Sequence, residues 1–124
     1  MENIIMEGTG RTPAIKLDAE NGFVEISGRS IPENSISFYK PVFDWLDEYS
    51  NQAKPLTEVV FNLEYFNTSS SKCILDILRK LEQLPENGNP IAVKWYYEDG
   101  DEDMEESGND FKSLINIDIE LVVK

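Results

Sequence analysis

Segments with the periodicity of strands alternate along this chain with segments that have the periodicity of helices, and this alternation favours an α/β fold. Apolar side chains occupy every second position in the strand-like segments and recur at spacings of three and four in the helix-like ones. The predicted strands are Ala14–Asp18, Phe23–Ser27, Glu58–Tyr65, Ile91–Tyr97 and Ile117–Val123. Because a helix-like segment separates each of the later strands from the one before it, we expect parallel pairing with right-handed crossovers.

The first two strands differ from the others because only a short turn joins them. Asn21-Gly22 lies in that turn and tolerates positive φ, so these strands are predicted to form an antiparallel hairpin. The third strand carries apolar residues on both faces, which is typical of a central strand. One predicted face consists of Val59, Phe61, Leu63 and Tyr65, and Val60 adds apolar area to the other.

The first predicted helix follows a polar break at Ile31-Pro32-Glu33-Asn34-Ser35, where Asn34 or Ser35 can act as the N-cap. Its apolar face is formed by Phe38, Val42, Trp45, Leu46 and Tyr49. Pro41 removes one backbone donor and restrains Lys40. We therefore expect either a kink at Pro41 or a helix that begins near it.

The second predicted helix runs to Leu84 and has the strongest apolar stripe, formed by Ile74, Ile77, Leu78, Leu81 and Leu84. A weaker third helix contains Met104, Phe111 and Leu114, and Gly108 disfavours it by about 1 kcal/mol relative to alanine. The predicted order is β-β-α-β-α-β-α-β, in one α/β domain that spans residues 1–124 around a mixed central sheet.

Composition argues against most catalytic chemistry. The chain has no histidine, no glycine-rich phosphate loop and no paired cysteines, so we expect neither an enzyme nor a cofactor. Cys73 falls in the first turn of the second predicted helix, where a thiol pKa can be depressed, but a small buried hydrophobe is the favoured interpretation. The acidic loop Glu98–Asp103 does not fit a calcium loop, because Met104 and Asp110 occupy the positions of the required glycine and glutamate.

Charge and the chain's start indicate where the protein works. A net charge of −13 disfavours nucleic acid and anionic membranes as partners. A single cysteine suits a reducing compartment, and the first residues lack the basic and apolar regions of a signal peptide. We therefore expect a cytoplasmic protein without a membrane span.

The run Asn67-Thr68-Ser69-Ser70-Ser71-Lys72 has two interpretations. In the first, a hydroxyl of Thr68 or Ser69 caps the second helix by accepting from a free N–H group of its first turn. In the second, the helix N-terminus favours a phosphoryl group on Thr68, and Lys72 reaches that group from one turn further on. Residue types alone leave both open.

Several segments resemble those of the SiaC-type bacterial regulators, and together they span nearly the whole chain. They are Gly10-Arg11-Thr12-Pro13-Ala14-Ile15, Ile31-Pro32-Glu33-Asn34-Ser35, Tyr39 to Leu46, Leu63-Glu64-Tyr65-Phe66-Asn67-Thr68-Ser69-Ser70-Ser71-Lys72 and Val93-Lys94-Trp95-Tyr96-Tyr97.

The resemblance implies a fold similar to STAS domains, with a phosphoacceptor between a central strand and the following helix. It implies a cognate serine/threonine kinase, a PP2C-like phosphatase and an output target, which in the best-known systems is a diguanylate cyclase. That target places the family in cyclic di-GMP signalling and biofilm regulation. The acceptor carries over to Thr68, supported by Asn67, Ser69, Ser70 and Lys72.

The unphosphorylated form is expected to bind the target and phosphorylation to release it. Glu33, Asn34 and Tyr65 are predicted to form the surface that partners read, although Asn34 also has the simpler interpretation of a helix cap. Two alternatives stay open: a constitutive adaptor or small-ligand module in which Thr68 is only a cap, and, less favoured, an enzyme that uses Cys73 or a serine.

Overall fold

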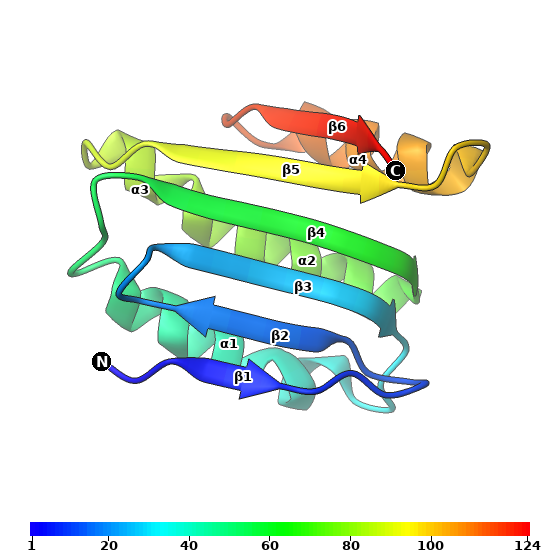
Figure 1. Ribbon diagram of the computed structural model, residues 1–124, viewed down its shortest axis with the longest axis horizontal. Helices are drawn as coiled ribbons and strands as arrows, with labels where there is room; N and C mark the ends of the chain where they lie inside the picture. The colour runs from blue at the N-terminus through cyan, green and yellow to red at the C-terminus, as the bar shows by residue number, and fades with distance from the viewer.

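Three successive strand-helix-strand units place every helix of this chain on one face of one sheet (Figure 1). The computed structural model describes residues 1–124. Its strands are β1 (Ile4–Met6), β2 (Ala14–Asp18), β3 (Phe23–Ser30), β4 (Thr57–Phe66), β5 (Ile91–Tyr97) and β6 (Ile119–Val123), and they lie in the sheet in chain order. The β1–β2 and β2–β3 pairs are antiparallel, and the other three pairs are parallel. The predicted α/β class, mixed sheet and hairpin are confirmed.

The predicted order lacked one strand and one short helix. β1 pairs with β2 at the edge of the sheet, and its central residue, Ile5, is 74% exposed. Three consecutive apolar residues in a short edge strand produce no alternation, so there was no strand period to detect. Several predicted strand boundaries also move: β3 continues to Ser30, β4 is one residue longer at each end, and β6 begins only at Ile119.

The helices are α1 (Ser35–Tyr49), α2 (Thr68–Leu81), α3 (Gln83–Glu86) and α4 (Glu102–Leu114). α1 begins at Ser35, so the alternative start near Pro41 is wrong. Pro41 is exposed and removes only its own donor, while the opposite face of α1 is held in the core. α2 ends at Leu81 rather than Leu84, which lies in α3 and is still buried. None of these helices combines the length and apolar character that crossing a membrane requires.

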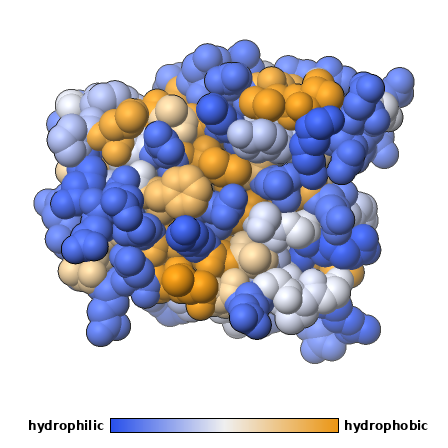
Figure 2. Space-filling view, viewed as in Figure 1, coloured by the Kyte–Doolittle hydropathy of each residue, from blue (hydrophilic) through white to orange (hydrophobic).

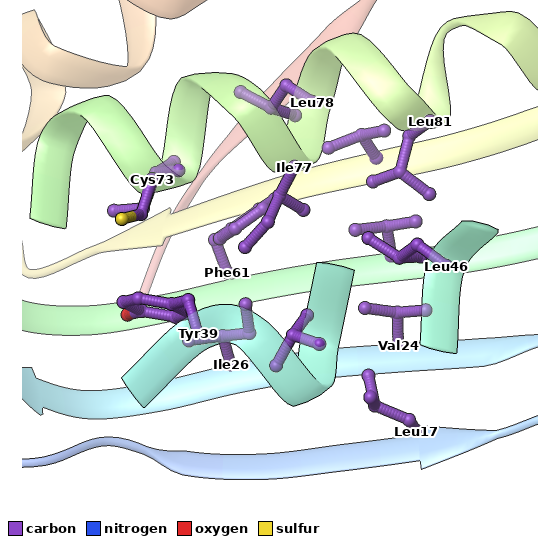
Figure 3. Packing of buried hydrophobic residues seen from close by; sticks show 14 of the residues in the cluster. Leu17, Val24, Ile26, Tyr39, Leu46, Phe61, Cys73, Ile77, Leu78 and Leu81 are labelled. Atoms are coloured by element: carbon purple, nitrogen blue, oxygen red, sulfur yellow. The ribbon is translucent and has the colours of Figure 1, made fainter. Parts of the chain in front are cut away.

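The core lies between the sheet and its helical layer. Figure 3 shows the apolar stripe of α2 pointing toward the sheet, with Ile77 above Phe61 and Leu81 near Leu46 of α1. Leu78 and Ile77 are fully buried, as the helical stripe predicted. This packing holds α2 against the sheet.

The opposite face of the sheet carries no helix. Val60 is only half-buried there, so the predicted burial of β4 on both faces is wrong for that side. Figure 2 shows this face with apolar patches separated by hydrophilic side chains. β4 is nevertheless central, because it pairs with β3 on one side and β5 on the other.

A β-bulge near the end of β4 changes which side chains enter the core. Gly28 of β3 pairs with Leu63, and the next residue, Arg29, pairs with Tyr65, so Glu64 is the additional residue. Tyr65 is consequently 51% exposed instead of continuing the apolar face with Leu63, as the alternation had predicted. Phe66 turns inward and packs at right angles to Trp95, with 6.1 Å between ring centroids.

Candidate functional site

The carboxyl ends of β3 and β4 meet the N-termini of α1 and α2 at one end of the sheet. Asn67 is the N-cap of α2, because its Oδ1 accepts from the backbone N–H of Ser70 at 2.9 Å. The Asn67 N–H donates to the carbonyl of Ser30 at 3.0 Å, which ties the cap to β3. The interpretation in which a hydroxyl of Thr68 or Ser69 caps this helix is therefore wrong.

The four hydroxyls that follow Asn67 have different surroundings. Thr68 is exposed, and its hydroxyl makes no hydrogen bond with the protein. Ser69 is exposed, but its hydroxyl lies 2.8 Å from that of Ser35 and donates to Asn67 Oδ1 at 3.2 Å. Ser70 is fully buried and Ser71 is half-buried. Of the four, only Thr68 offers a hydroxyl that is both exposed and free.

Behind Thr68 lies a chain of hydrogen-bonded hydroxyls, buried except for the exposed Ser69, which we call the hydroxyl network: Ser30, Ser35, Tyr39, Ser69 and Ser70. Ser30 Oγ donates to Ser70 Oγ at 2.8 Å, and Ser70 Oγ donates to the Ser30 carbonyl at 3.0 Å. Tyr39 OH, 2.6 Å from Ser30 Oγ, must therefore donate to it. Since Ser69 donates to Asn67, Ser35 donates to Ser69, and every hydroxyl proton of the network has one acceptor.

The network joins three elements at the site. Ser30 belongs to β3, Tyr39 and Ser35 to α1, and Ser69 and Ser70 to α2. Burial is the main reason that the pKa of Tyr39 rises to about 12, so its hydroxyl remains a neutral donor. The sequence interpretation missed Ser30 and Tyr39 as parts of the site. Only Tyr39 carried a signal, because it shares the helical spacing of Val42, Leu46 and Tyr49.

The N-terminus of α2 is electrostatically suited to an anion. The N–H groups of Thr68 and Ser69 have no intrahelical partner, and the helix dipole adds positive potential there. Lys72 lies one turn after Thr68, is exposed and takes part in no ion pair. The structure therefore keeps a free hydroxyl and a free ammonium on neighbouring turns of one helix.

The residues predicted to contact partners lie at this same end of the sheet. The Ser35–Ser69 hydrogen bond brings the N-terminus of α1 beside Thr68. Asn34 caps α1 by accepting from the Ser37 N–H at 3.1 Å, and Glu33 is exposed, 3.9 Å from the Arg11 guanidinium. The exposed Tyr65 ring has the Arg29 guanidinium 5.9 Å from its centroid. Sequence reasoning had not included these two arginines in the site.

Two other candidate groups have structural roles. Cys73 is 2% exposed, and burial raises the pKa of its thiol, so the depressed pKa considered from the sequence is wrong. In the acidic loop, Asp101 caps α4 by accepting from the Met104 N–H at 3.0 Å. Neither group provides a nucleophile at the site.

Comparison with known proteins identifies close likenesses over nearly the whole chain. The sequence pattern of the SiaC family regulatory phosphoproteins matches residues 6–124. An uncharacterized protein of Pseudomonas aeruginosa strain UCBPP-PA14 is 34% identical over 112 residues, which cover 90% of this chain and 89% of that protein. The solved structure of SiaC of Pseudomonas aeruginosa matches all of both chains with a TM-score of 0.90 and 30% identity.

A second solved structure adds a partner. A crystal structure of the diguanylate cyclase SiaD in complex with its activator SiaC from Pseudomonas aeruginosa matches with a TM-score of 0.91 and 30% identity. The match covers 98% of this chain and 99% of that one.

Proposed function

We propose that this chain, which belongs to the SiaC family of regulatory phosphoproteins, is a non-catalytic regulator that changes partners when Thr68 is phosphorylated. The observation that carries the proposal is the state of the Thr68 hydroxyl, which is exposed and unbonded at the N-terminus of α2. Its neighbours Ser69 and Ser70 are tied into the hydroxyl network. Capping, the competing role for Thr68, already belongs to Asn67.

A phosphoryl group on Thr68 fits the folded chain. It adds a charge of about −1.5 to −2 at pH 7. At a helix N-terminus that charge gains roughly 0.3–2 kcal/mol from the dipole. The net charge of −13 opposes it only weakly, because most of that charge is distant and screened. Phosphorylation therefore alters the surface of the domain and leaves its fold intact.

The output target that we propose is a diguanylate cyclase, by analogy with the complex of SiaC with SiaD. The unphosphorylated protein binds this target through the surface around Thr68. Burying an unpaired dianion in such an interface costs several kcal/mol, which exceeds the stabilisation that the helix dipole provides. Since about 1.4 kcal/mol corresponds to a factor of ten, affinity falls roughly a hundredfold or more on phosphorylation.

A cognate kinase and a PP2C-like phosphatase set the state of Thr68 in this proposal. Both are inferred from the family resemblance. Glu33, Asn34 and Tyr65 are assigned to the partner surface, since they are exposed and lie at the same end of the sheet as Thr68. Pull-down of the target with Glu33→Ala tests this surface, because Glu33 has only an exposed ion pair to lose. Unchanged binding would remove Glu33 from the interface.

The phosphoacceptor is tested by intact-mass measurement after co-expression with the neighbouring genes. We expect a gain of one phosphate in the wild type and in Ser71→Ala, which is the matched control from the same helical turn. Thr68→Ala should gain none. If the wild type also gains none, the chain is instead a constitutive adaptor or ligand-binding module.

A further inference from the structure

A groove runs beside Thr68 between the end of β4, the first turn of α2 and the length of α4. It consists of two adjoining hollows of about 320 and 240 Å³, which share Phe66 and Ser107 in their walls. In Figure 1 this region lies at the right-hand edge, where β4 ends below the loop that leads into α4. Thr68 lies two residues after the shared Phe66, and Ser71 of the same helical turn lines the second hollow.

The walls of this acidic groove combine apolar surface with carboxylates. Its apolar lining comes from Tyr65, Phe66, Met104, Phe111 and Leu114, and its carboxylates are Glu64, Asp101, Asp103 and Asp110. No lysine or arginine lines either hollow. On α4 itself the only basic side chain is Lys112, which is 3.3 Å from Asp118 and so is already paired.

The chemistry of an occupant follows from these walls. Apolar side chains that remain accessible in a hollow favour an apolar or aromatic anchor, and uncompensated carboxylates around it favour lysine or arginine. Opposite charge also raises the rate of encounter, and that contribution weakens as ionic strength rises. The groove therefore suits a basic segment with an apolar anchor.

The placement of Thr68 indicates which partner needs such a groove. Thr68 is the first residue of a helix whose first two turns are held by the buried Ser70 and Cys73. It cannot be drawn out as an extended peptide without breaking that packing, so an enzyme that modifies it must recognise the folded surface. A phosphatase can bind the phosphate group itself. A kinase meets a neutral hydroxyl and must therefore recognise the surface around it.

We propose that the acidic groove is the docking site for a basic, apolar-anchored segment of the kinase that phosphorylates Thr68. The proposal rests on the proposed function, since it assumes that Thr68 is the acceptor. An output target fits the groove less well. A basic segment in the groove would be held more firmly once a phosphate stood beside it, which is the opposite of release.

The test compares charge reversal inside and outside the groove. The groove variant carries Glu64→Lys, Asp103→Lys and Asp110→Lys, three exposed residues without ion pairs. The matched control carries Glu20→Lys, Glu48→Lys and Glu86→Lys, which change the net charge equally away from the groove and likewise break no ion pair. Steady-state phosphorylation of each protein by the cognate kinase is measured at low and high salt, with thermal melts to verify folding.

We expect the groove variant to raise KM roughly tenfold or more with kcat nearly unchanged, because docking energy is spent on binding and not on the transfer step. Its KM should also lose the salt dependence of the wild type. The control should stay within about twofold of the wild type. A second groove variant, Glu64→Gln with Asp103→Asn and Asp110→Asn, should raise KM by a smaller factor, and it replaces the reversal variant if that variant fails to fold.

Three results would overturn the proposal, and each has a distinct meaning. Equal KM values for the groove variant and the control would remove the groove from kinase recognition. A normal KM together with lost binding of the diguanylate cyclase would assign the groove to the output target. Absence of Thr68 phosphorylation in the wild type would refute the proposed function itself, and the docking site would fall with it.

Discussion

Replacing Ser70 with alanine removes the oxygen at the centre of the hydroxyl network. Ser70 Oγ accepts the proton of Ser30 Oγ, which in turn accepts the proton of Tyr39. Without Ser70 Oγ, the Ser30 and Tyr39 hydroxyls hold two protons but can bond only to each other, so one buried O–H group has no acceptor. The Ser30 carbonyl stays satisfied, because it also accepts from the Asn67 N–H at 3.0 Å.

The cost follows from this proton count. An orphaned buried donor costs about 1–3 kcal/mol. Alanine favours the helix by about half a kcal/mol relative to serine, which offsets part of this cost. Ser70→Ala should therefore lower the free energy of unfolding by roughly 0.5–2.5 kcal/mol, because the cost of the orphaned proton exceeds the gain in helix propensity.

Tyr39→Phe is the matched control, because it also removes one oxygen from the same network. It takes away a donor and leaves no proton without an acceptor: Ser30 still donates to Ser70, and Ser70 to the Ser30 carbonyl. The expected loss is below about 1 kcal/mol, the usual net value of one hydrogen bond.

Urea denaturation of the two variants and the wild type measures both losses, and the order of the variants carries the test. The expected order is a larger loss for Ser70→Ala than for Tyr39→Phe. An equal or larger loss for Tyr39→Phe would show that the protons are not arranged as described.

Three further outcomes follow from the packing. Leu78→Ala should cost roughly 2–5 kcal/mol in chemical denaturation, because Leu78 is fully buried, and a cost under about 1 kcal/mol would contradict its place in the core. Gly108→Ala should destabilise by about 1–3 kcal/mol despite better helix propensity, since its Cβ would lie 2.6 Å from the Trp95 ring; exposed Asn109→Ala is the control that should not destabilise. Cys73 should react with iodoacetamide in native protein far more slowly than in urea, because its thiol is buried and its pKa raised; equal rates would refute that burial.

The sequence was most informative where one periodicity persisted for several turns or residues. The apolar stripe of α2 predicted the burial of Ile77 and Leu78, and alternation located β2 and β5 at their observed bounds. A side chain that repeats on a face reports where the core lies. Gly108 shows the limit of propensity: it disfavours a helix locally, yet α4 requires it because Trp95 fills the space of a side chain.

What the sequence could not provide were the irregular contacts that build the site. The bulge at Glu64 reverses the faces of Tyr65 and Phe66, and nothing in the alternation marks an inserted residue. No sequence pattern marks a buried serine either, because serine is usually exposed. The burial of Ser30 and Ser70 depends on partners far along the chain. The placement of Thr68 between β4 and α2 was predicted, whereas the network behind it became visible only in three dimensions.

The phosphorylation switch is tested most directly by calorimetric titration of the diguanylate cyclase target with both forms of this protein, alongside thermal melts of each form. The unphosphorylated protein should bind at least about a hundredfold more tightly than the protein phosphorylated at Thr68, since that factor corresponds to about 2.7 kcal/mol of dianion desolvation. The melting temperatures of the two forms should be nearly equal, because the helix N-terminus accommodates the charge. Equal affinities would contradict the switch, and a large fall in melting temperature would mean that phosphorylation acts by unfolding the domain.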